Sequence, residues 1–318
     1  MSAGAVEGRG GGSEASAIAS RAASVRPATR RWYSHPYNRA TLYRLAGALR
    51  VVPRPVRLGL ARGLGQLGAR WVPAERAAIR TALARFTGAE EPALDALTRA
   101  VFRNFAMCFS DLVSTNRRAA GWLAAHMVGD PSGIEWPGES TGGAVSLSAH
   151  VGSWELAGRL LATRSRRPTH VVVSDDEAPE LLPWVRRNGD GLRFVPRSRP
   201  TVSLELVAAL RRGEIVALHG DRALGNAGDV LVPFFGHPAP FPIGPFRLAR
   251  AAGVPVVPAF CLLDADRRYR VLLRAPIRVP AGGEEDALRA WILGLEEVVR
   301  GYPTQWFNFF DVWGPPGG

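Results

Sequence analysis

The stretch "LSAHVGSWELAGRLL", residues 147–161, decides the fold, because a strand-like run changes into a helix-like run within a few residues. Gly152 permits a tight bend between the two runs, and Ser153 is typical of a residue that caps the start of a helix. Beyond this stretch, short apolar runs keep alternating with helical ones. The alternation predicts an α/β fold with a mostly parallel central sheet and helices on both faces.

The expected strands share short runs rich in β-branched and apolar residues, and they are GAVSLSA, THVVVS, LRFVP, EIVALH, VLVPFF, VPVVPAFCLL and RYRVLLRAPIRV. Helical patterns are expected near 154–164, 178–188, 201–212, 243–252 and 284–300. Residues 1–32 lack the apolar segment of a signal peptide and are expected to be a disordered tail. Residues 33–318 are expected to form one domain, with a helical part at 33–116 and an α/β core at 117–318.

The helical part contains an amphipathic segment with arginines between its apolar positions. Those positions recur at helical spacing and are Val56, Leu60, Leu64, Leu67 and Trp71. Two interpretations stay open: the apolar face belongs to the core, or it lies on an anionic membrane surface. No run of about 20 apolar residues occurs, so no membrane-spanning helix is expected.

The composition restricts the chemistry. The formal net charge is +12, and all 40 basic residues are arginine. The lack of lysine excludes Schiff-base chemistry, lysine-bound pyridoxal phosphate and a P-loop. The charge favours an acidic phospholipid or a phosphate-bearing substrate as partner, and no nucleic-acid-binding motif is present. The two cysteines lie in apolar segments and are expected to be buried thiols.

His150 and Glu155 are a candidate acid/base pair. On one straight helix, side chains five positions apart diverge by about 140°. Here a turn, VGSW, separates a histidine at a strand end from a glutamate in the first helical turn, so the two can meet. Glu155 would then fix the tautomer of His150. A purely structural pair is the alternative. His170 and Asp175 have the same spacing along a strand, about 16 Å apart at ~3.3 Å per residue, and cannot touch.

Further motifs follow in order, namely GDR at 220–222, VPFFG at 232–236, PIG at 242–244 and LARAAGVPVVP at 248–258. Together with H-x4-E, this order resembles the lysophospholipid acyltransferase superfamily. The resemblance is strongest to the branch with the late acyltransferases of lipid A biosynthesis and phosphatidylinositol mannoside acyltransferase. Glu155 in place of aspartate, and the lack of an F-P-E-G-T-R block, speak against a plain lysophosphatidate acceptor.

The resemblance implies a set of site residues. The expected catalytic residues are His150, Glu155, Arg197 and Asp221. Arg222, Ser153, Trp154 and Gly244 are expected to contact substrate. The helix that opens at Gly244 can offer backbone N–H groups to a phosphate, with ordinary helix capping as the alternative. No metal and no cofactor are expected, since acyl-CoA or acyl carrier protein serves as the donor substrate.

The resemblance implies an O-acyltransferase that acts on a lipid or glycolipid hydroxyl, peripherally attached to the cytoplasmic face of a bacterial inner membrane. Three alternatives stay open: an acyltransferase for an aryl-polyene or pigment lipid, which the ending PTQWFNFFDVW at 303–313 resembles, a non-catalytic lipid-binding protein of the same fold, and a hydrolase. The aromatic residues of this ending are interpreted as core, acyl-chain pocket or membrane anchor.

Overall fold

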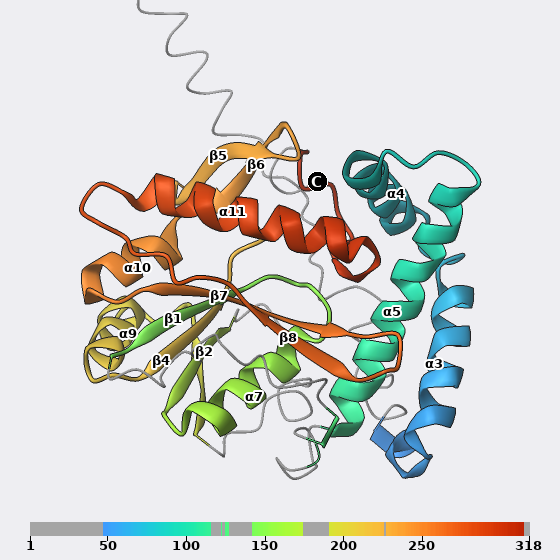
Figure 1. Ribbon diagram of the computed structural model, residues 1–318, viewed down its shortest axis with the longest axis horizontal. Coiled ribbons are helices and arrows are strands. Elements are labelled where there is room, and N and C mark those ends of the chain that lie inside the picture. The colour runs from blue at the N-terminus through green and yellow to red at the C-terminus, as the bar shows by residue number, and fades with distance from the viewer. Residues whose placement is uncertain are drawn as a thin grey trace, which may run out of the picture.

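The computed structural model describes residues 47–115, 122, 125–126, 142–173, 191–225 and 227–314 (Figure 1). The predicted N-terminal tail and the helix predicted at 178–188 lie outside these ranges. The described part is an α/β structure built around one mixed sheet, which confirms the expected fold class.

The central sheet has six strands in the order β3-β2-β4-β1-β7-β8. The strands are β1 (Ala144–Ser148), β2 (Thr169–Val173), β3 (Leu192–Pro196), β4 (Ile215–His219), β7 (Val256–Leu263) and β8 (Tyr269–Leu273). Neighbouring strands are parallel except β8, which runs antiparallel to β7. The sheet is therefore mostly parallel, and the carboxyl ends of β1 and β4 lie side by side.

Helices cover both faces of the sheet, and in Figure 1 α11 and α7 lie on opposite sides of it. Among the described residues, the α-helices that follow the first strand are α7 (Trp154–Ser165), α9 (Val202–Arg211), α10 (Gly244–Ala252) and α11 (Glu284–Gly301). Side-chain alternation along β7 shows the two layers: Phe260 and Leu262 belong to the core with α10 and α11, whereas Ala259 and Cys261 belong to the core with α7. Both cysteines are buried free thiols, as expected.

One of the predicted strands belongs to a separate hairpin and not to the central sheet. The segment VLVPFF forms β5 (Asp229–Phe234), which pairs antiparallel with β6 (His237–Pro242) and is not part of the central sheet. Phe235 and Gly236 connect the two strands with φ values of +49° and +77°. Two residues with positive φ make a tight hairpin turn, and such a turn joins antiparallel neighbours rather than parallel ones.

The N-terminal part is helical, with η3 (Leu49–Val51), α3 (Arg54–Gly68), α4 (Pro73–Thr87) and α5 (Ala93–Thr115). In Figure 1, α5 lies between α3 and the sheet. Gly65 makes the close approach of α3 to α5 possible, because a Cβ there would lie 2.5 Å from the carbonyl oxygen of Phe102. None of the helices that the structure describes has the length and apolar character needed to cross a bilayer.

The amphipathic face of the N-terminal part points outward. Its apolar side chains, Val56, Leu60, Leu64, Leu67 and Trp71, are all exposed. The inner face of α3 contacts α5 through other residues, with Leu58 fully buried. The interpretation of this stripe as core therefore does not hold in the described structure.

Candidate active site

The register of two neighbouring strands brings His150 and Asp221 together. Parallel strands β1 and β4 pair Ser148 with His219 at their carboxyl ends. The N–H of Gly220 continues this ladder to the carbonyl of Ser148 at 2.9 Å. His150 and Asp221 each lie two residues beyond the last paired residue of their strand, so the same register places them opposite each other. The carboxyl edge of an open α/β sheet is where ligands bind.

Asp221 holds His150 through two hydrogen bonds. Nδ1 of the imidazole lies 2.7 Å from Oδ1, and the backbone N–H of His150 donates to Oδ2 at 3.0 Å. Oδ2 also accepts hydrogen bonds from Trp306 Nε1 at 3.0 Å and from Asn308 Nδ2 at 3.3 Å. The Asp221 side chain is fully buried, whereas that of His150 is 14% exposed. The carboxylate is thus satisfied inside the protein, and the ring keeps some access to its surface.

The electrostatics favour a neutral imidazole beside an ionised carboxylate. Burial lowers the pKa of His150 and the positive charge of Arg222 acts in the same direction, against the opposing effect of Asp221. Burial alone would favour a protonated Asp221, but the charge and hydrogen bonds of His150, together with Arg222, hold its pKa far below the usual range. Because an ionised carboxylate only accepts hydrogen bonds, Nδ1 carries the proton and Nε2 is the basic atom.

The turn after His150 is fixed by its backbone. Gly152 has a φ of +60°, and a Cβ there would lie 2.3 Å from the carbonyl oxygen of Cys261, which confirms glycine as the residue of the bend. Gly152 N–H donates to the carbonyl of Gln305, and Ser153 N–H donates to that of Cys261. Ser153 occupies the N-cap position of α7, as predicted, but its side chain makes no capping hydrogen bond. The Ser153 side chain is buried, and its contact with substrate stays a prediction.

Glu155 occupies the expected place in the first turn of α7 but is not the residue at Nδ1 of His150. Asp221 supplies the carboxylate at Nδ1, because the register of the neighbouring strands β1 and β4 places it opposite His150. Glu155 lines the cleft described below, together with Trp154. The ring of Trp154 lies 5.1 Å from that of His150. Catalytic action by Glu155 and substrate contact by Trp154 stay predictions.

The two predicted arginines lie in different places. Arg222 donates from Nε to Asn308 Oδ1 at 3.0 Å and from a terminal nitrogen to the carbonyl of Phe307 at 3.2 Å. Arg197 follows β3 at the edge of the sheet, and its side chain is exposed. β3 is three strand spacings from β1, roughly 14 Å at ~4.8 Å each. The structure therefore groups Arg222 with His150 and leaves Arg197 apart.

Gly244 is the first residue of α10 and is exposed, while the next two residues are buried. Within the described ranges, no cluster of three or more His, Cys, Asp or Glu side chains could hold a metal ion. In the second pair with this spacing, His170 and Asp175, Nε2 of His170 lies 2.7 Å from Oε2 of Glu214. Asp175 is outside the described residues.

The segment after α11 supplies residues that sequence reasoning did not assign to the site. Trp306 and Phe307 are buried, in agreement with the core interpretation of this aromatic run. Trp306 and Asn308 also donate to Asp221, a role that the aromatic pattern did not indicate. The signal that could have found Asn308 is a lone amide within "WFNFF", because a buried polar side chain needs a hydrogen-bond partner. Phe234 of the VPFFG motif packs edge-on against Trp306, with ring centroids 5.4 Å apart.

An open cleft lies between α7 and the central sheet. Its empty volume, part of it open to solvent, is about 820 Å³. Small side chains form part of its lining, among them Ser146, Ser148, Ala217, Ala157 and Gly158. His150 does not line it. His219 and Trp154 do, and the ring of His219 lies 4.8 Å from that of His150.

This arrangement can remove a proton from a hydroxyl or a water. The basic Nε2 atom has its orientation fixed by Asp221, and a guanidinium lies nearby to stabilise negative charge. Apolar side chains make up most of the lining of the cleft beside it.

Comparison with known proteins shows the family of this chain. Residues 35–314 match the model of the bacterial lipid A biosynthesis acyltransferase family. The chain is also 29% identical over 178 residues to "Phosphatidylinositol mannoside acyltransferase" from two strains of Mycobacterium tuberculosis, CDC 1551 / Oshkosh and ATCC 25618 / H37Rv. Each match covers 54% of this chain and 54% of the relative, so the chain spans about half the length of these relatives. Because the family model covers most of the chain, the protein belongs to the bacterial lipid A biosynthesis acyltransferase family.

Proposed function

We propose that this protein transfers a fatty acyl chain from an acyl thioester, acyl-CoA or acyl carrier protein, to a hydroxyl of a lipid or glycolipid. The observation that carries the proposal is the His150–Asp221 pair at the sheet edge, next to an apolar cleft. Membership of an acyltransferase family and the names of the mycobacterial relatives support the same chemistry. The acceptor class follows from those names and from the family.

In this reaction His150 Nε2 takes the proton of the acceptor hydroxyl as the oxygen forms a bond to the thioester carbonyl carbon. The tetrahedral intermediate then collapses, the carbon–sulfur bond breaks, and the proton on Nε2 passes to the departing thiolate. Asp221 stabilises the imidazolium that exists between these two steps. General base action of this kind supplies a factor of about 10²–10⁴ in rate.

Arg222 is assigned the developing oxyanion or a phosphate of the substrate. Its guanidinium is held by Asn308 and by the carbonyl of Phe307, and its charge already acts on His150. A fixed cation close to the base suits this role. Arg197 follows β3, three strands away from β1, so we assign it to a more distant part of the substrate.

The cleft under α7 is assigned to the acyl chain. Its walls combine apolar side chains from the sheet with residues of α7, among which Glu155 and Arg159 are charged. An apolar chain in this cleft would bring its thioester carbonyl past Trp154 toward His150. Glu155 would then act on substrate at the border of the cleft instead of orienting the base.

The acceptor is a membrane lipid in this proposal, so the reaction takes place at a membrane surface. The donors are intracellular metabolites or carrier proteins, which places that surface on the cytoplasmic side of the membrane. Attachment is peripheral. An aryl-polyene or pigment lipid remains within the proposed acceptor class.

The test is transfer of a radiolabelled acyl chain from acyl-CoA or acyl carrier protein to lipid extract, followed by thin-layer chromatography. We expect each of two variants to lower the rate at least 100-fold, since His150→Ala removes the base and Asp221→Asn removes the carboxylate that orients it. His237→Ala changes an exposed histidine at the start of β6 and serves as the matched control. Unchanged transfer by folded His150→Ala protein would reduce the pair to a structural one, and release of free fatty acid without acylated lipid would identify a hydrolase.

A further inference from the structure

An apolar stripe runs along the outer face of α3 and the residues that follow it. We call Val56, Leu60, Leu64, Leu67 and Trp71 the α3 stripe; their exposed fractions are 54%, 51%, 63%, 50% and 82%. Among the described residues, these five and nearby Val51 are six of the ten large apolar side chains that are exposed. The other four are scattered over the rest of the fold. Concentration on one helix face marks an interaction surface.

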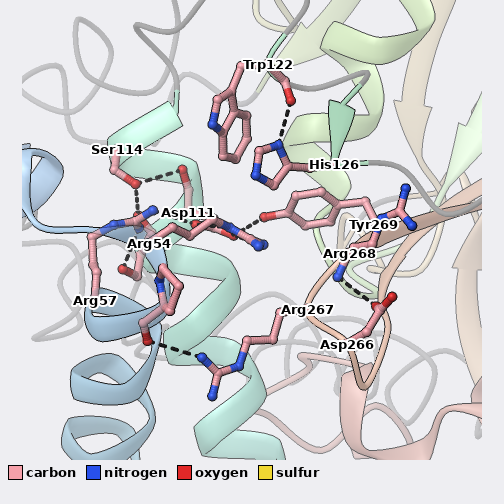
Figure 2. Close-up of polar contacts among 12 residues, drawn as sticks. Arg54, Arg57, Asp111, Ser114, Trp122, His126, Asp266, Arg267, Arg268 and Tyr269 are labelled. Atoms are coloured by element: carbon pink, nitrogen blue, oxygen red, sulfur yellow. Dashed lines mark hydrogen bonds and ion pairs between the residues drawn. The ribbon is translucent and has the colours of Figure 1, made fainter.

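The opposite face of α3 is held to the rest of the protein by a buried ionic cluster (Figure 2). Arg54 and Arg57 both bond the carboxylate of Asp111 on α5, each with a shortest distance of 2.7 Å. Asp111 is fully buried and also accepts a hydrogen bond from the hydroxyl of Tyr269 at the start of β8. Burial and the charge of Asp111 raise the pKa of Tyr269 well above its usual value, so the phenol stays protonated and donates.

This cluster fixes which side of α3 faces outward. Turning the α3 stripe inward would expose Leu58 and separate Arg57 from Asp111, leaving a buried charge without compensation. It would also move Gly65 away from α5, where no side chain fits because a Cβ would lie 2.7 Å from Cβ of Ala106. The stripe therefore stays on the surface of the part of the chain that the structure describes.

The charge around the stripe identifies its partner. Residues 47–74, which carry the stripe, contain five arginines and no acidic residue, whereas the whole chain carries 28 acidic residues. Arg62 and Arg70 lie within or next to α3 and are exposed. A second copy of this chain would bring like charges together, whereas an anionic bilayer offers negative headgroups above an apolar interior. An amphipathic segment with arginines and a terminal tryptophan suits that boundary.

We infer that the α3 stripe is the membrane-docking surface of this protein, with its apolar side chains inserted at the headgroup–acyl boundary of an anionic bilayer. The choice of a lipid bilayer rests in part on the proposed function, because the acceptor would be a membrane lipid. α5 links this surface to the site: it bonds α3 through Asp111, and its Phe105 packs on Phe307, ring centroids 5.4 Å apart. Docking through α3 thus sets the position of the site relative to the lipid.

The experiment is co-sedimentation of the full chain with vesicles of phosphatidylcholine, alone or mixed with anionic phosphatidylglycerol, whose negative surface attracts basic segments. We expect binding to the anionic vesicles and at least tenfold weaker binding by Leu60→Gln/Leu64→Gln. Leu204→Gln/Leu293→Gln removes two leucines of α9 and α11 that are 74% and 62% exposed, and this variant should bind as the unchanged protein does. Glutamine keeps helix propensity close to that of leucine, so both variants should fold, as circular dichroism can verify.

Equal binding by the stripe variant and the control variant would overturn the inference. So would an oligomer in analytical ultracentrifugation that the stripe variant alone dissolves, because the stripe would then hold a second copy. Vesicle binding by His150→Ala protein separates the two proposals. If that variant still transfers acyl chains, the proposed chemistry fails, while its binding to vesicles still tests the docking surface.

Discussion

At the residue scale, the site depends on opposing electrostatic effects around one imidazole. Asp221 favours the protonated ring of His150, whereas burial and Arg222 favour the neutral ring, and the neutral ring prevails. A base must be unprotonated at the working pH, so the lowered pKa of His150 suits a general base near neutral pH. Asp221 contributes orientation and stabilises the charge formed during reaction.

Arg222→Gln should therefore move the acid limb of the pH–rate profile. The pKa of His150 lies below its ordinary value of 6.5, so activity should rise with pH below 6.5 and level off near neutrality. Loss of the positive charge makes the imidazolium easier to form, which raises this pKa and shifts the limb to higher pH. Arg222→Lys keeps the charge and should leave the limb in place. A rate that falls equally at every pH would instead restrict Arg222 to substrate binding.

Sequence reasoning found only part of this residue-level design. His150 and Gly152 were predicted correctly in place, because the turn pattern and the need for a bend are local. The Nδ1 partner of His150 was not, because Asp221 is 71 residues away and reaches it only through the order of β1 and β4 in the sheet. The spacing of residues along the chain does not reveal the order of strands in the sheet. A polar residue two positions after the end of each of two strands is still a usable signal that the two side chains meet.

At the element scale, the contact between α3 and α5 determines which face of α3 points outward. The sequence shows an amphipathic helix but leaves open whether its apolar stripe faces a core. The structure answers this through the small residue Gly65 and the buried carboxylate Asp111, which together assign the other face of α3 to α5. A buried ion pair of this kind is stronger evidence for one specific arrangement than for added stability.

Gly65→Ala should destabilise the protein by about 1–3 kcal/mol, the usual cost of overpacking, because the new methyl group meets a backbone carbonyl. Gly63→Ala is the matched control, since no atom lies within 4 Å of a Cβ there. This control should stabilise the protein by up to about 1 kcal/mol through helix propensity. Urea unfolding followed by circular dichroism measures both, and a Gly65→Ala protein as stable as the control would contradict the close α3–α5 packing.

At the scale of the whole molecule, the net charge of +12 attracts the protein to anionic surfaces. A cationic protein at an anionic bilayer is held partly by screened, long-range attraction, which weakens as salt shortens the Debye length from about 10 Å at 0.1 M to about 3 Å at 1 M. The apolar α3 stripe adds a contribution that salt does not screen.

We therefore expect transfer to an acceptor in anionic vesicles to fall at least fivefold between about 0.1 M and 1 M salt, the range over which screening becomes complete. Transfer to a short-chain, monodisperse acceptor should change far less, because no surface has to be reached. Parallel rate measurements with the two acceptors provide the comparison. The same salt dependence for both would assign the charge to substrate binding in the site and not to the membrane.

The sequence by itself determined the alternating strands and helices, the family, the histidine and the bend that follows it, since each is a local pattern or an ordered series of motifs. The tertiary structure decided what depends on neighbours distant in sequence: Asp221 as the partner of His150, Trp306 and Asn308 as its supports, the separate β5–β6 hairpin, and the outward face of α3. The physical reason is the same in each case. Local propensity sets the period of a segment, but only packing and strand order determine which surfaces meet.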